Sequence, residues 1–240
     1  MKRWIEHISW WWFAPLTLIG TLAILSSPFT DKPSGDLYMQ EKTAYQEKAV
    51  PPREMPMVEI VNIPPECEIY TEQITRYYLA LAEGWEQELC SEYGLSDALY
   101  DYIGADPLQE IGFCCTDLNA DGVPELLIGS LDPECPAILE LWTVVSEKPK
   151  LIAQAEGQSR YYLRRSESTA DTILENITGS KGQEAACFYF TFNGVHLEYL
   201  WDIFPDVSGD EQEARRAAAA ELGGERILPN HTAYAALNIA

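Results

Sequence analysis

The first periodic segment of the chain runs from residue 71 to residue 92. Its apolar residues recur at spacings of three and four, which places them along one face of an α-helix. They are Ile74, Tyr78, Leu81, Trp85 and Leu89. Ser96 predicts the cap of a second, short helix that ends at Gly104, and Asp106 before a proline predicts a third helix start. The sequence therefore predicts a helical region ahead of the strands.

Beyond residue 110 the pattern changes to short apolar or alternating runs separated by turn residues. These runs predict strands over residues 111–116, 125–130, 137–145, 151–155, 160–164, 172–175, 186–192 and 196–201. Asn193 followed by Gly194 is a strong hairpin signal. Short strands that follow one another closely favour an antiparallel meander. Residues 210–222 are rich in Ala, Glu and Arg and predict a closing helix.

The fold class that follows is α+β, with N-terminal helices packed on an antiparallel β-meander and preceded by a single transmembrane helix. The transmembrane helix is predicted from residues 8–25, a nearly uncharged stretch of 18 residues. A helix needs about 20 such residues to cross the hydrocarbon core. Three tryptophans stand near the start of this stretch, and Lys2 and Arg3 precede it. This arrangement predicts a cytoplasmic N-terminus and an exported remainder.

The apolar stretch can be a retained signal anchor or a cleaved signal peptide. Ile24 and Leu25 stand where a cleavage site needs small residues. We therefore favour the anchor, with secretion after cleavage as the alternative. The domain organisation is then residues 1–27 as signal anchor or signal peptide, 28–66 as tether and 67–240 as extracytoplasmic domain. The tether holds seven of the fifteen prolines, and residues 57–63 can form an edge strand that begins the domain.

The charge of the chain is strongly negative. It has 240 residues and a formal net charge of -22. Such a surface repels phosphate backbones, so we expect no nucleic-acid partner. It attracts divalent cations and basic partners.

Six cysteines are present, and their spacing does not indicate zinc. An exported domain can oxidise some of them, whereas buried free thiols are the alternative, and the sequence does not determine a pairing. Cys114 and Cys115 are adjacent on a predicted strand, so their side chains point to opposite faces. At most one of the two can then face a given partner.

One segment, residues 117–125, carries recognisable site chemistry. Oxygen-bearing side chains stand at alternate positions, and a glycine at 122 allows a left-handed turn. The expected metal ligands are Asp117, Asn119, Asp121, the carbonyl of Val123, and Glu125. Hard oxygen donors at this spacing suit one structural Ca²⁺, which accepts six to eight ligands. The alternative is an acidic turn that binds nothing.

The first half of this loop fits the EF-hand pattern, but the twelfth position is Ile128 and a predicted strand follows in place of a helix. The loop is similar to those of FG-GAP repeats in integrin-type propellers, which carry it many times. Here it occurs once, which excludes a propeller. The stretch 111–130 resembles uncharacterised exported proteins of Gram-positive bacteria that carry a single D-x-[DN]-x-D-G-x-P-E-L loop. The resemblance implies export and cation binding and implies no enzyme activity. Many of those proteins are lipoproteins, and this chain lacks the lipid-attachment cysteine.

Two functions remain after the motif search. The sequence lacks HExxH, G-x-S-x-G, P-loop and G-x-G-x-x-G patterns. We therefore expect a membrane-anchored extracytoplasmic binding or interaction domain stabilised by one Ca²⁺, with a protein or cell-envelope partner, and we favour a non-enzyme. The alternative is an exported hydrolase acting on cell-wall or carbohydrate substrates. That hydrolase would use an unidentified carboxylate pair or a Cys187–His196 pair, and four aromatic residues could line its cleft. These are Trp142, Tyr161, Tyr162 and Trp201.

Overall fold

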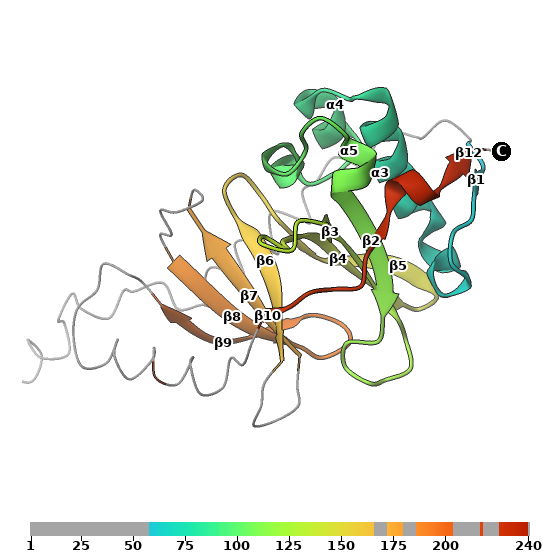
Figure 1. Cartoon of the computed structure of the whole chain (residues 1–240). Helices are drawn as coiled ribbons and strands as arrows, with labels where there is room; N and C mark the ends of the chain where they lie inside the picture. Colours follow the sequence, from blue (N-terminus) through green and yellow to red (C-terminus); the bar gives the residue numbers. More distant parts are fainter. Residues whose placement is uncertain (1–57, 166–171, 180–185, 204–216, 218–225, 240) are drawn as a thin grey trace, which may run out of the picture. The chain divides into compact units, whose positions relative to one another are not determined.

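The framework of the domain is a ten-stranded antiparallel sheet (Figure 1). The computed structural model describes residues 58–165, 172–179, 186–203, 217 and 226–239. The predicted transmembrane segment, most of the tether and nearly all of the predicted helix 210–222 lie outside these residues. Within the described ranges, no helix is long and apolar enough to cross a membrane.

The sheet strands are β2 Ile111–Thr116, β3 Glu125–Ser130, β4 Ile138–Val145, β5 Lys148–Gln154, β6 Arg160–Arg165, β7 Thr172–Thr178, β8 Ala186–Phe192, β9 Leu197–Ile203, β10 Arg226–Ile227 and β11 Thr232–Ala233. Their order is β11-β2-β3-β4-β6-β7-β8-β9, with β5 paired to β4 and β10 paired to β6. The predicted meander is therefore confirmed for β2–β4 and for β6–β9. The predicted bounds are confirmed for β2, β3 and β8, whereas β7 extends beyond the predicted residue 175 to Thr178.

In the part of the chain that the structure describes, five helices precede the ten-stranded sheet, and the sequence predicts a helical region in this place. They are the 3-10 helices η2 Pro65–Tyr70 and η3 Asp97–Asp101, and the α-helices α3 Thr71–Glu83, α4 Gln87–Glu92 and α5 Pro107–Glu110. Figure 1 shows α3, α4 and α5 grouped at the β2 end of the sheet, away from β7–β9. Helices and an antiparallel sheet in separate regions make this an α+β domain.

The predicted single helix over residues 71–92 is wrong, because Gly84 divides it into α3 and α4. Gly84 has φ 64° and donates its N–H to the carbonyl of Ala80. This left-handed C-cap is the usual way in which a glycine ends a helix. The predicted apolar stripe also shifts at one position, since Tyr77 is buried and Tyr78 only half-buried.

The last fourteen described residues return through the domain in a way that the sequence does not predict. After β10 and β11 come the 3-10 helix η4 Tyr234–Ala236 and the strand β12 Asn238–Ile239. β12 pairs with β1 Ile60–Val61, which lies in the edge strand expected over residues 57–63. Tyr234 is fully buried and packs against Phe113 of β2, with ring centroids 5.0 Å apart. The C-terminal segment therefore links the first described strand to the core.

One disulfide, between Cys67 and Cys115, joins η2 to β2. Cys114, the neighbour of Cys115 on the strand, is a free thiol, as expected for side chains on opposite faces. Among the described residues, Cys90, Cys135 and Cys187 form no disulfide. The domain therefore contains both of the cysteine states that the sequence left open.

Candidate cation-binding loop

The predicted loop is the turn of a hairpin between β2 and β3. Thr116 and Glu125 are cross-strand partners at its base. Ala120 and Gly122 both have positive φ, 59° and 88° respectively. Glycine adopts this left-handed conformation readily, which is the role expected for Gly122. The hairpin therefore needs two left-handed residues to turn within eight positions.

The carboxylates of Asp117 and Asp121 accept hydrogen bonds from backbone N–H groups of the same loop. Asp117 Oδ2 accepts the N–H of Gly122 at 2.8 Å, and Asp117 Oδ1 accepts that of Asp121 at 3.2 Å. Asp121 Oδ1 accepts the N–H of Val123 at 2.8 Å. Asn119 Nδ2 donates to Asp121 Oδ2 at 2.8 Å. These bonds bring Asp117, Asn119 and Asp121 into one turn, with both aspartates exposed to solvent.

Glu125 differs from the other loop carboxylates because it is fully buried. Its Oε2 accepts the N–H of Leu118 at 2.8 Å, and its Oε1 accepts the hydroxyl of Thr143 at 3.0 Å. Burial raises the pKa of Glu125 to about 7, and the charges of Asp121 and Asp117 add to the rise. The two hydrogen bonds oppose it. No described Lys, Arg or His forms an ion pair with this carboxylate.

Residues far from the loop in the sequence hold it in place. The hydroxyl of Tyr70 donates to the carbonyl of Pro124 at 2.7 Å. A Cβ on Gly194 would lie 2.7 Å from Asn119 Nδ2 and 2.8 Å from Asp121 Oδ2, so the β8–β9 turn packs closely on the loop. The sequence indicates Gly194 only as a hairpin residue, and it contains no local signal for Tyr70 or Thr143. The roles of Tyr70, Thr143 and Gly194 depend on contacts with residues that lie 18 to 75 positions away in the sequence.

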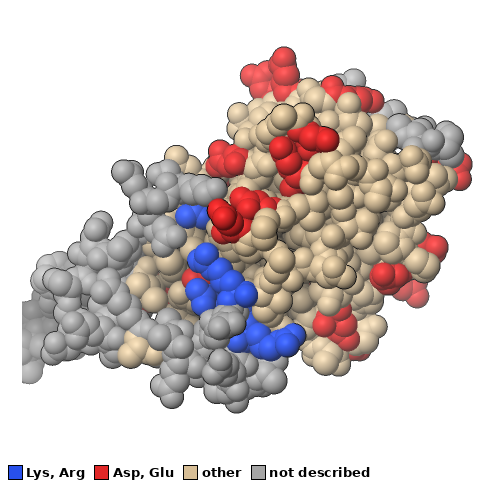
Figure 2. All heavy atoms as spheres, in the orientation of Figure 1, with Lys and Arg blue, Asp and Glu red and all other residues tan. Residues whose placement is uncertain are grey.

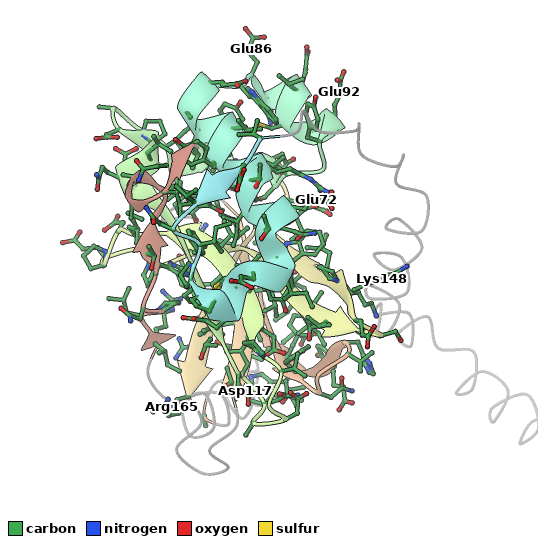
Figure 3. The ribbon with its side chains drawn as sticks, turned by 90° about the vertical axis from the view of Figure 1, so that its right-hand side faces the viewer. Glu72, Glu86, Glu92, Asp117, Lys148 and Arg165 are labelled. Carbon is green, nitrogen blue, oxygen red and sulfur yellow. A yellow bond between two sulfur atoms is a disulfide. The ribbon has the colours of Figure 1, made fainter. Side chains whose placement is uncertain are left out.

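The loop brings together Asp117, Asn119 and Asp121 of the predicted ligand set, whereas Glu125 lies at its buried base and bonds Leu118 and Thr143. Among the described residues, no three His, Cys, Asp or Glu side chains converge closely enough to hold an ion by themselves. The predicted set also contains the Asn119 amide oxygen and the Val123 carbonyl, which such a grouping of side chains does not include. Figure 3 shows Asp117 at the end opposite Glu86, which precedes α4, and Glu92, which ends it.

The residues considered for a hydrolase are separated or buried. Cys187 pairs with Ile203 at one end of the β8–β9 hairpin, whereas His196 immediately precedes Leu197 at the other. At about 3.3 Å per strand residue, these two side chains are roughly 17 Å apart, so they form no catalytic pair.

The four aromatic residues considered for a sugar cleft have other neighbours. Tyr161 and Tyr162 are buried. Trp142 donates its indole N–H to Glu140 at 2.7 Å. Trp201 stacks on Tyr189 with ring centroids 5.0 Å apart. These contacts are typical of structural aromatic residues.

No protein-family model, curated protein or solved structure matches this chain.

Proposed function

We propose that this chain is a membrane-anchored extracytoplasmic binding domain in which one Ca²⁺ stabilises the β2–β3 hairpin. The expected ligands are Asp117, Asn119, Asp121, the Val123 carbonyl and Glu125. The anchor is the apolar N-terminal stretch, residues 8–25. Export and anchoring rest on the order of segments along the chain, whereas ion binding rests on the residues of the loop.

The observation that supports ion binding is that no described positive charge balances the buried carboxylate of Glu125. This carboxylate is buried, it lies beside the charges of Asp117 and Asp121, and no described cationic side chain neutralises it. A buried carboxylate without a cation costs stability unless it is protonated or coordinates a metal. Oxygen donors from five positions of one turn favour Ca²⁺, because Ca²⁺ accepts irregular geometry, whereas Mg²⁺ requires a near-ideal octahedron.

The role proposed for the ion is structural. It would neutralise three carboxylates at the point where β2 turns into β3, and β3 is buried along its whole length. Ion binding would therefore stabilise the central part of the sheet. No helix follows the loop, so the helix-opening switch of EF-hand sensors has no counterpart here.

No specific observation favours the alternative function, an exported hydrolase. Besides Glu125, the fully buried glutamates of the described ranges are Glu140 and Glu175. Gln154, Trp142 and the Ser96 N–H donate to Glu140, while two arginines and Tyr189 hold Glu175. Side chains held in this way are suited to structural roles.

Thermal unfolding of the full chain, with excess CaCl₂ and with chelator, tests the proposal. At an ion concentration of about 100 times Kd, binding contributes about 2.7 kcal/mol. For a domain of this size, that energy raises Tm by about 5–10 °C. Asp121→Ala should abolish this calcium-dependent rise. The matched control is Asp101→Ala, which removes an exposed carboxylate from η3 and should keep the rise. An unchanged Tm of the wild-type chain on calcium addition would contradict the proposal.

A further inference from the structure

A cavity of about 410 Å³ lies between β2 and β6, beside the segment that leads from β10 to β11. Its volume falls within the roughly 300–1,000 Å³ of pockets that take small ligands. Phe113, Leu127 and Leu163 contribute apolar lining and are buried. Leu228, also in the lining, keeps 55% of its surface exposed. The cavity therefore offers apolar surface that an apolar group could cover.

The charged lining residues come from opposite walls of this cavity. Arg165 ends β6 on one wall. On the other wall, Glu66 belongs to η2 and Asp117 follows β2. All three are exposed to solvent. Figure 3 shows Asp117 and Arg165 at the same end of the molecule. The cavity is thus positive on the β6 side and negative on the β2 side.

Two further arginines lie on or near β6 without lining the cavity. Arg164 of β6 and Arg226 of β10 both contact Glu175 Oε2 at 2.9 Å, so one carboxylate is shared by two guanidinium groups. No described carboxylate forms an ion pair with Arg165. Figure 2 shows Lys and Arg side chains gathered in one patch over the region of β6 and β10, whereas acidic side chains are scattered around it. This cationic patch stands out in a chain with a net charge of -22.

We propose that the cavity binds an amino acid or a short peptide with an apolar side chain, in zwitterionic form. The ligand carboxylate would pair with the guanidinium of Arg165, which suits a carboxylate because its N–H donors form a planar fork. The ligand ammonium would lie toward Glu66, because both oxygens of Asp117 accept backbone N–H groups within the loop. The apolar side chain would cover Leu163 and Leu228. This inference goes beyond the proposed structural ion and stands on the cavity alone.

The free thiol of Cys114 lines the same cavity and provides a local readout of occupancy. N-ethylmaleimide labelling of Cys114 in the full chain is followed by peptide mass spectrometry, with Cys187 as an internal control thiol. Chelator is present throughout, so failure of the calcium proposal leaves this assay unaffected. The probes are L-phenylalanine, its N-acetyl derivative without the ammonium, and its amide without the carboxylate.

A ligand of this size has an expected Kd of about 1 mM. At about 10 mM, L-phenylalanine should then slow Cys114 labelling about tenfold and leave Cys187 labelling unchanged. Each single-charge derivative should protect less. Arg165→Gln should raise the Kd about tenfold, because a hydrogen bond to a charged group is lost, which leaves only about twofold protection.

Lys148→Gln is the matched control, because Lys148 is an exposed cation on β5 and does not line the cavity. In this variant, L-phenylalanine should protect Cys114 from labelling as strongly as in the wild type. Glu66→Gln should reduce protection by L-phenylalanine and leave that by the N-acetyl derivative unchanged. Absence of protection by L-phenylalanine would overturn the proposal. The proposal would also be overturned if L-phenylalanine protected Cys114 equally in Arg165→Gln and in the wild type. Equal protection of wild-type Cys114 by all three probes would overturn it as well.

Discussion

The backbone N–H of Ser96 donates to Oε1 of Glu140 at 3.0 Å, which joins the helical region to the centre of the sheet. Glu140 lies in β4 and is only 2% exposed. Gln154 donates to the same oxygen at 2.8 Å. The Ser96 hydroxyl donates to the carbonyl of Ala155 at 2.6 Å and does not cap the helix that follows, contrary to the sequence prediction.

Glu140→Met tests this junction, because methionine is similar in size and accepts no strong hydrogen bond. The buried N–H of Ser96 and the part-buried donors of Trp142 and Gln154 would lose this acceptor, at a cost of about 1–3 kcal/mol for each buried donor left unpaired. We expect a loss of about 3 kcal/mol or more in the free energy of unfolding, measured by urea denaturation. Glu134→Met, at an exposed turn position, should change it by less than about 0.5 kcal/mol. A Glu140→Met chain as stable as the wild type would show that the junction contributes nothing.

The Cys67–Cys115 disulfide closes a segment with a sequence separation of 48. A cross-link of this span stabilises the fold by about 4 kcal/mol in the chain-entropy model. We expect reductant to lower the free energy of unfolding by about that amount. Cys114→Ser should retain the sensitivity to reductant, whereas Cys115→Ser should be less stable from the outset and insensitive. Peptide mapping without reductant checks the pairing, and a Cys67 linked to any other cysteine would refute it.

His231 provides the pH prediction. Both ring nitrogens are buried, and burial lowers the pKa of His231 from 6.5 to about 4 against an opposing interaction with the backbone of Ser130. Because the folded pKa is the lower one, the folded state disfavours the protonated ring. The stability contribution is therefore complete above about pH 6.5 and is lost as the pH falls toward 4. The loss is at most about 3 kcal/mol.

His231→Phe keeps a planar ring and removes the titration. Urea denaturation at several pH values between 4 and 7 should show a steeper loss of stability in the wild type than in this variant. The ring packs near two glycines of the sheet, since a Cβ on Gly129 would lie 3.1 Å from its Cε1. Parallel pH profiles for the two chains would contradict the prediction, because they would show that folding does not lower the pKa of His231.

Local patterns predict elements well where neighbouring residues decide the conformation. The strand Ala186–Phe192 is correct at both ends because a β-rich run is flanked by turn residues. The helix prediction fails at Gly84, because periodicity continues through a residue whose backbone turns left-handed. β11 is missed because it has two residues, and its pairing with β2 depends on a chain that returns from far along the sequence.

The candidate loop likewise has some features that the local sequence predicts and others that depend on the whole fold. The sequence by itself determined the oxygen donors of Asp117, Asn119 and Asp121 and the left-handed Gly122, because these features depend on residues a few positions apart. Only the tertiary structure decided that Glu125 is buried beneath Thr143, that Gly194 packs on the loop, and that Arg165 shares a cavity with Asp117. The physical reason is range: side-chain chemistry and turn geometry are local, whereas burial and charge environment are set by strands that pair only when the whole sheet forms.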